Sequence, residues 1–184
     1  MAADTSYTPK VYKKAGGDTL VVASGGNIEV EAGGQINLGT AAVDANGDTL
    51  TVTAALHAGR VIQFGKASGT VVTLPAATGT GNKYTFVIGV TATSNANIIK
   101  VANATDVMDG SLCLQQDTDG DGTLKLWRAD AGDDTITLAG AATTGGIVGG
   151  VIEAIDYKAG FWTCFVRTQS GGGAEATPFS ATVS

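Results

Sequence analysis

Three glycine pairs divide the N-terminal part of the chain into very short segments, and they lie at 16–17, 25–26 and 33–34. In the runs DTLVVAS, NIEVEA and QINLGT, which follow the pairs in turn, apolar and polar residues tend to alternate. Such alternation places every second side chain on one face of a β-strand, and glycine supplies the positive φ of the sharp turn between strands. The pattern predicts a stem of short strands over residues 15–56. Strands this short bury little alone, which favours a second layer or a partner chain.

From residue 57 onward the apolar runs become longer. Examples are NKYTFVIGV (82–90) and FWTCFVR (161–167), and clusters of Gly, Asn, Asp and Ser separate the runs. Short strands at regular spacing, with no helical pattern between them, are typical of an antiparallel β-sandwich or barrel. The sequence therefore predicts an all-β protein with an extended arm (1–14), the glycine-punctuated stem (15–56) and a β-sandwich or barrel domain (57–184).

The charge of the 184-residue chain limits its partners. The net charge is −6, which argues against nucleic acid, because phosphate binding needs clustered Lys and Arg. No run approaches the ~20 apolar residues of a membrane span. The N-terminus lacks the apolar region of a secretory signal. We expect neither nucleic acid nor membrane as a partner, and we expect the protein to be made in a cytoplasm.

The arm differs in charge from the rest of the chain. Residues 1–14 hold three lysines and one aspartate, a balance of +2, whereas the remaining 170 residues hold eight basic and sixteen acidic residues, a balance of −8. A basic arm with aromatic residues is suited to an acidic partner surface. Its candidate binding residues are Tyr7, Lys10, Tyr12, Lys13 and Lys14. The alternative is a solvated terminus without a partner.

No catalytic motif accompanies the reactive residue types. His57 is the single histidine, and no nucleophile elbow or similar motif lies beside it. Cys113 and Cys164 lie in apolar, strand-like runs, where a reduced thiol is an ordinary small core residue. We expect no enzymatic activity.

The best metal candidate is the string DTDGDG at 117–122, which matches the first half of a calcium loop. Asp117, Asp119 and Asp121 would supply the oxygen ligands. The position of the closing glutamate, however, is occupied by Arg128, and Asp and Gly are also the residues of a hairpin tip. The hairpin tip is the preferred interpretation, so no metal or other cofactor is favoured, with calcium as the weaker alternative.

Aromatic residues gather late in the chain, at Tyr157, Phe161, Trp162 and Phe165. They could form a platform on which sugars stack. Aromatic residues on both faces of one strand, however, usually belong to a core or a subunit interface. Core packing is the favoured interpretation.

Several long strings resemble small virion proteins of tailed bacteriophages, of the head decoration or cement type. They are YTPKVYKKAGGDTLVVASGGNIEVEAGGQINL (7–38), VVTLPAATGTGNKYTFVIGVTATSNANIIKVANATDVMDG (71–110), DDTITLAGAATTGGIVGGVIEAIDYKAG (133–160) and EATPFSATVS (175–184). The resemblance implies a structural protein on the capsid exterior that binds the major capsid protein. It also implies an oligomer, with a homotrimer as the expected form, that stabilises the shell.

Two other classes compete with decoration. A receptor- or glycan-binding knob of a head or tail fibre would also combine a slender stem with a β-domain, but it should carry exposed aromatic residues in a groove. Trp127 and Trp162 both lie within apolar, strand-like runs rather than in loops, which favours the decoration protein. A bacterial adhesin is disfavoured by the absent signal peptide.

Overall fold

The computed structural model divides the chain into two compact units, Met1–Gly39 and Thr40–Ser184. The residues that it describes are 11–13, 16, 20–29, 41–118, 122–172 and 174–183. In the first unit, β1 (Val11–Lys13) and β2 (Leu20–Val22) form a two-stranded antiparallel sheet. After β2, Gly25 has a φ of 73°, and the N–H of Gly26 closes the turn on the carbonyl of Ala23 at 2.8 Å. Residues 30–40 of the predicted stem lie outside the described residues.

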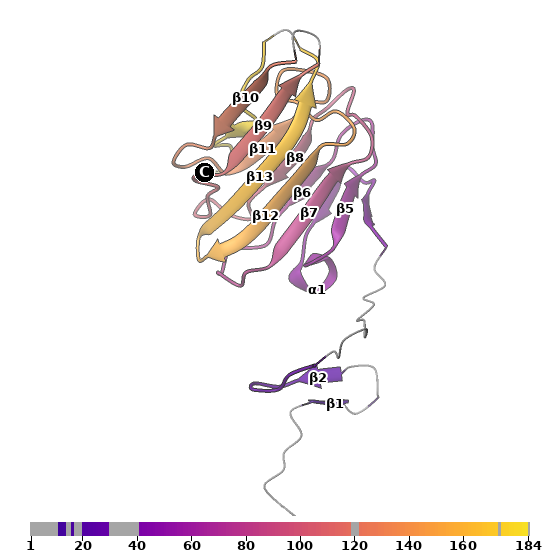
Figure 1. Ribbon diagram of the computed structural model, residues 1–184, viewed down its shortest axis with the longest axis vertical. Helices are drawn as coiled ribbons and strands as arrows, with labels where there is room; N and C mark the ends of the chain where they lie inside the picture. Colours follow the sequence, from indigo (N-terminus) through magenta and orange to yellow (C-terminus); the bar gives the residue numbers. More distant parts are fainter. Residues whose placement is uncertain are drawn as a thin grey trace, which may run out of the picture. The chain divides into compact units, whose positions relative to one another are not determined.

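The second unit is a β-sandwich of two sheets packed face to face, which confirms the predicted all-β class (Figure 1). The larger sheet has seven strands in the order β10-β9-β13-β12-β7-β5-β3, and the smaller has five in the order β14-β11-β8-β6-β4. The strands are β3 (Val43–Ala45), β4 (Thr49–Thr51), β5 (Val61–Phe64), β6 (Val71–Thr73), β7 (Lys83–Ile88), β8 (Asn97–Lys100), β9 (Leu112–Asp117), β10 (Leu124–Arg128), β11 (Thr135–Leu138), β12 (Val151–Lys158), β13 (Phe161–Ser170) and β14 (Phe179–Ser180).

From β3 to β8 the chain alternates between the two sheets. Strands β3, β5 and β7 therefore lie parallel in the larger sheet, and β4, β6 and β8 lie parallel in the smaller one. A parallel pair needs a crossover of a dozen or more residues, and here the strand in the opposite sheet is part of that crossover. The expectation of an antiparallel sandwich is wrong for these strands. The alternation of apolar and polar residues and the strand lengths are the same whether consecutive strands form hairpins or cross between the two sheets, so the sequence does not distinguish the two arrangements.

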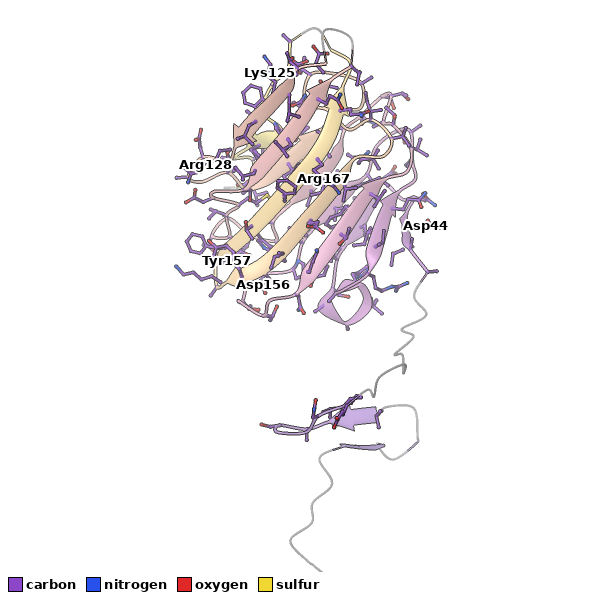
Figure 2. The ribbon with its side chains drawn as sticks, in the orientation of Figure 1. Asp44, Lys125, Arg128, Asp156, Tyr157 and Arg167 are labelled. Carbon is purple, nitrogen blue, oxygen red and sulfur yellow. The ribbon has the colours of Figure 1, made fainter. Side chains whose placement is uncertain are left out.

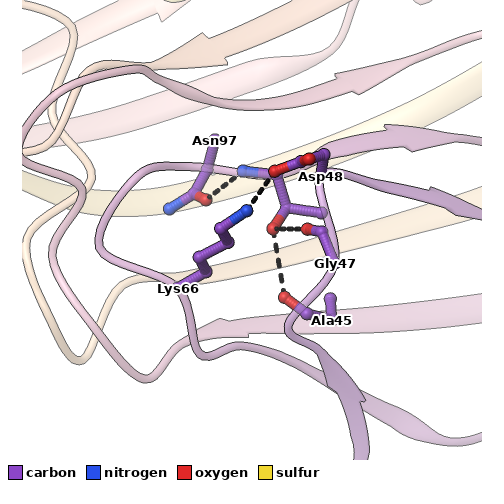
Figure 3. Close-up of polar contacts among 6 residues, drawn as sticks. Ala45, Gly47, Asp48, Lys66 and Asn97 are labelled. Carbon is purple, nitrogen blue, oxygen red and sulfur yellow. Dashed lines mark hydrogen bonds and ion pairs between the residues drawn. The ribbon is translucent and has the colours of Figure 1, made fainter.

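Hydrogen bonds of Thr70 connect the turns of successive crossings. Figure 3 labels Ala45, Gly47, Asp48, Lys66 and Asn97 in these turns. The buried Thr70 hydroxyl lies 2.8 Å from the carbonyl oxygen of Gly47, in the turn before β4, and 3.1 Å from that of Ala45, at the end of β3. The N–H of Thr70 donates to Oδ1 of Asn97, at the start of β8, at 3.2 Å. An ion pair between Lys66 and Asp48 joins the same turns at the surface. One threonine thus links three successive crossings.

The core lies between the two sheets and follows the alternation of the strands. On β7 the side chains of Tyr84, Phe86 and Ile88 are buried, while the residues between them face outward. Trp162 on β13 is fully buried and packs against Tyr84 with ring centroids 5.8 Å apart. The smaller sheet contributes the buried residues Val72, Ile99, Ile136, Leu138 and Phe179.

The boundary between the units lies earlier than the sequence placed it. The predicted stem includes residues 40–56, yet β3 and β4 pair with β5 and β6 in the second unit. Ala45 and Val52 are buried in the common core, and a single helical turn, α1 (Ala54–His57), leads from β4 toward β5. This stretch repeats the string GDTL of the stem (17–20 and 47–50), so the sequence alone did not show that it belongs to the sandwich.

Candidate interaction surfaces

The arm residues proposed as capsid-binding fall largely outside the described part of the chain. Tyr12 and Lys13 belong to β1, whose backbone pairs with β2. Tyr7, Lys10 and Lys14 are not among the described residues. The binding role of all five stays a prediction.

The candidate calcium loop lies between two strands that pair with each other. Strands β9 and β10 pair antiparallel on either side of it, and the N–H of Asp117 donates to the carbonyl of Thr123 at 3.0 Å. Asp119 and Asp121 lie outside the described residues. Among the residues that are described, no group of three or more possible metal-ligating side chains gathers anywhere. Calcium binding by Asp117, Asp119 and Asp121 stays a prediction.

The side chains of His57, Cys113 and Cys164 are all buried. The His57 ring accepts the N–H of Thr53 on Nδ1 at 3.0 Å, which ties the end of α1 to its start. Cys113 and Cys164 are free and buried on the neighbouring strands β9 and β13. Burial raises the pKa of both thiols to about 12, and for Cys164 the hydrogen bond to Ser111 partly opposes this rise. These thiols are therefore protonated and shielded at neutral pH.

The aromatic cluster is divided between the two faces of the larger sheet. Trp162 lies in the core, as the favoured interpretation expected, but Phe165 and Tyr157 lie on the outer face and are 36% and 50% exposed. Tyr157 lies beside Phe161, with ring centroids 6.3 Å apart, and the Lys158 ammonium lies 4.5 Å from the centre of the Phe161 ring. Core packing therefore explains the position of Trp162, but it does not explain Phe165 and Tyr157, which lie on the outer face.

The outer face of the larger sheet carries an apolar surface on β9, β10 and β13. We call it the apolar outer face, and its members are Leu112, Leu114, Leu124, Leu126 and Phe165. Register places Leu126 opposite Leu114, and Leu112 opposite Phe165. Leu124 and Leu126 are 65% and 63% exposed. Contiguous apolar side chains of this kind mark interaction sites more often than ordinary surface.

Arg167 lies in the middle of this sheet and is exposed on its outer face (Figure 2). It is flanked in register by Leu114 on β9 and Val151 on β12. Arg167 forms no ion pair with any residue that the structure describes. It lines a groove of about 310 Å³ together with Leu114, Gln116, Leu124, Val148 and Gln169. A cation with apolar neighbours can bind a carboxylate that arrives with apolar contacts of its own.

The sequence held a signal for this face. In SLCLQQ (111–116) the inward-facing Cys113 alternates with Leu112 and Leu114, and in TLKLWRA (123–129) Leu124 and Leu126 alternate with inward-facing residues. Leucine on the solvent-facing parity of two paired strands is unusual for an antiparallel sheet exposed on one side. Recognising it required the pairing of the two strands, which the sequence alone did not fix.

Across the described ranges, no helix is long and apolar enough to cross a membrane. The sandwich carries an apolar sheet face, a groove, and an arginine, Arg167, that forms no ion pair with a described residue. Comparison with protein-family models, curated proteins and solved structures gives no match for this chain.

Proposed function

We propose that the protein is a structural virion component that binds the outer surface of a phage capsid as an oligomer, with three copies as the expected number, and stabilises the shell. The observation that carries the proposal is the apolar outer face of the larger sheet, with Leu124 and Leu126 each more than 60% exposed. An exposed apolar surface of this kind favours a permanent partner in an assembly.

The charge distribution supports the same role. The basic arm, with Lys10, Lys13 and Lys14, precedes an acidic remainder of the chain, so the arm suits an acidic shell surface. Tyr7 and Tyr12 would anchor the arm by burial of their rings. An extended arm can also add a strand to a sheet of the major capsid protein, since backbone hydrogen bonds give affinity without a preformed pocket. Several arms in one oligomer would increase the avidity.

The test is direct binding to capsids. Purified full-length protein is mixed with expanded capsids that lack it, and the particles are imaged by cryo-electron microscopy. We expect regular protrusions on the shell. Deletion of residues 1–14 should abolish binding while the circular dichroism spectrum of the sandwich is retained. Bare capsids beside folded wild-type protein would overturn the proposal.

A glycan-binding knob is the second candidate, and one observation favours it. Tyr157 is half exposed and lies against Phe161, so the two rings form a small aromatic surface at one end of β12 and β13. Stacking of sugars on exposed rings is the expected mode of binding. A glycan array with the wild-type protein and Tyr157→Ala tests it: binding that the substitution removes would favour the knob over the decoration protein.

A further inference from the structure

The larger sheet ends at two edges of different character. In the part of the chain that the structure describes, β10 pairs only with β9, and β3 pairs only with β5. An edge strand presents unpaired N–H and C=O groups, which another strand can extend. Figure 2 shows Lys125 and Arg128 at one side of this sheet and Asp44 at the other.

The free edge of β10 has a defined set of backbone groups. Its pairing with β9 is bounded by the hydrogen bond from Asp117 N–H to the Thr123 carbonyl at 3.0 Å, and by that from Ala129 N–H to the Ser111 carbonyl at 2.9 Å. In an antiparallel ladder every second residue faces its partner. The residues between Thr123 and Ala129 that direct their backbone groups to the free edge are therefore Leu124, Leu126 and Arg128.

The side chains of β10 are suited to pairing. Sheet edges that avoid association are short, bulged or charged along their length. On the outer face of β10, by contrast, two highly exposed leucines precede Arg128. On the inner face, Trp127 is only partly buried where the core ends, and its Nε1–H donates to Oε1 of Gln115 at 3.0 Å. A further strand beside β10 would cover Trp127.

The opposite edge complements this one. Asp44, at the centre of β3, is exposed on the outer face and forms no ion pair with a described residue. On the inner face Val43 is partly buried at the other end of the core, as Trp127 is at the first. The pair of Arg128 with Asp109 is long, at 3.8 Å, and exposed, so it contributes little and leaves Arg128 available.

We propose that β10 of one copy pairs with β3 of the next copy, so that the larger sheets join edge to edge in a closed ring. Asp44 then lies on the same face as Arg128 of the neighbour, and strand continuation covers Val43 and Trp127 together. Pairing of β10 with a second β10 would instead bring two copies of Arg128 together, which is unfavourable. Lys125 does not enter this comparison, because it already pairs with Glu175 at 3.8 Å. The inference rests on the oligomeric part of the proposed function and specifies its contact.

A contact between two different edges is heterologous, and such contacts either close into rings or continue as filaments. A ring of three copies would leave no free edge on the larger sheet, since each β10 meets one β3. It would also hold the apolar outer faces of the copies on one continuous surface, available to a shell. The contact joins the backbone groups of β10 and β3 and pairs Arg128 with Asp44, while the leucines of β10 remain on the outer face that the proposed role uses.

Chemical cross-linking of the full-length protein tests the contact. Ala42→Cys and Leu126→Cys place one thiol beside β3 and one on β10, on the same outer face, while Asp44 and Arg128 stay in place. A short bis-maleimide then reacts only with the introduced thiols, since Cys113 and Cys164 are buried. We expect the double variant to give covalent trimers on a denaturing gel, and each single variant to give at least tenfold less cross-linked product.

Charge reversal supplies the second measurement. Asp44→Arg and Arg128→Asp should each raise the dissociation constant of the oligomer at least tenfold by light scattering, and the double variant should restore it to within about threefold. Lys158→Asp, an exposed cation on β12, is the matched control and should change nothing. Cross-linking by Leu126→Cys alone would show like edges meeting and overturn the inference.

The remaining outcomes separate this inference from the proposed function. Oligomers without cross-links in the double variant would place the contact elsewhere and overturn the inference alone. A wild-type monomer in solution that still binds capsids would overturn the ring but retain shell binding. Stable rings that fail to bind capsids would support the edge contact and overturn the decoration role.

Discussion

The main-chain N–H of Gly79 donates to Oδ1 of Asp156 at 2.6 Å, which ties the loop before β7 to a strand 77 residues later. The same carboxylate accepts the hydroxyl of Thr80 at 2.7 Å and its N–H at 3.1 Å. Asp156 is only 3% exposed, on the inner face of β12. A single carboxylate therefore satisfies polar groups of the loop that precedes β7.

Replacement of Asp156 by asparagine should destabilise the sandwich. The asparagine NH₂ would face donors where the carboxylate accepts them, and the charge-assisted hydrogen bonds would be lost. We expect Asp156→Asn to lower the free energy of unfolding by about 1–3 kcal/mol at pH 7. Urea denaturation followed by tryptophan fluorescence measures it. An unchanged midpoint would show that solvent satisfies the loop.

Asp156 should also make the free energy of unfolding depend on pH. Burial opposes ionisation of Asp156, but the hydrogen bonds from Thr80, Gly79 and Thr78 outweigh it and hold its pKa below the usual 3.8. A lowered folded-state pKa adds stability above pH ~4 that is lost as pH falls through the folded value. The stability difference between wild type and Asp156→Asn should therefore narrow between pH 5 and pH 2. A constant difference across this range would contradict the assignment.

Thr70 should be the most sensitive threonine of the connected turns. Thr70→Val keeps the volume of the side chain but leaves the carbonyls of Ala45 and Gly47 without their buried donor. We expect a loss of about 1–3 kcal/mol in unfolding free energy. The matched substitution Thr51→Val, on an exposed strand position, should stay within about 0.5 kcal/mol of wild type. Equal effects would show that the hydroxyl of Thr70 contributes little.

Substitutions at two glycines can separate the free energy of a strained backbone φ from the free energy of a steric clash. Gly59 and Gly69 have φ of +72° and +77°, but a Cβ at Gly59 meets nothing within 4 Å, whereas one at Gly69 would lie 2.4 Å from the Ala96 carbonyl oxygen. Gly59→Ala should cost about 1–2 kcal/mol from its φ alone. Gly69→Ala should cost about 1–3 kcal/mol more, because the turns cannot separate freely. Thermal unfolding by calorimetry compares the two variants.

The native thiols should be unreactive while the protein is folded. Cys113 and Cys164 are buried, and their pKa values of about 12 leave almost no thiolate at pH 8. We expect Ellman's reagent to modify neither within an hour at pH 8, and both at once in guanidinium. Reaction of one thiol in native buffer would reveal local opening of β9 from β13.

Much of the sandwich could be predicted because its strands alternate cleanly. Tyr84, Phe86 and Ile88 face the core as their spacing indicates, and the two apolar runs on either side of 117–122 pair antiparallel as β9 and β10. Strand direction could not be predicted. Parallel and antiparallel neighbours need the same side-chain period, and only the tertiary path decides between them.

The polar contacts that fix the loops also escaped prediction. Asp156 and Thr70 resemble the many surface Asp and Thr of this chain, and nothing local shows that they are buried. Among their partners, Gly47 lies 23 residues from Thr70, and Gly79 lies 77 residues from Asp156. The apolar outer face escaped for a related reason, since Leu114 and Leu126 become neighbours only through the β9–β10 register.

The alternation of the chain between the two sheets has a consequence for how such a protein can vary. Each crossing from the larger sheet to the smaller and back is one coil, and β3, β5 and β7 begin successive coils 18 and 22 residues apart. Repetitive architectures of this kind gain and lose whole units, since each unit contacts mainly its neighbours. Insertion or deletion of one complete coil would widen or narrow both layers together and leave the strands on either side in register.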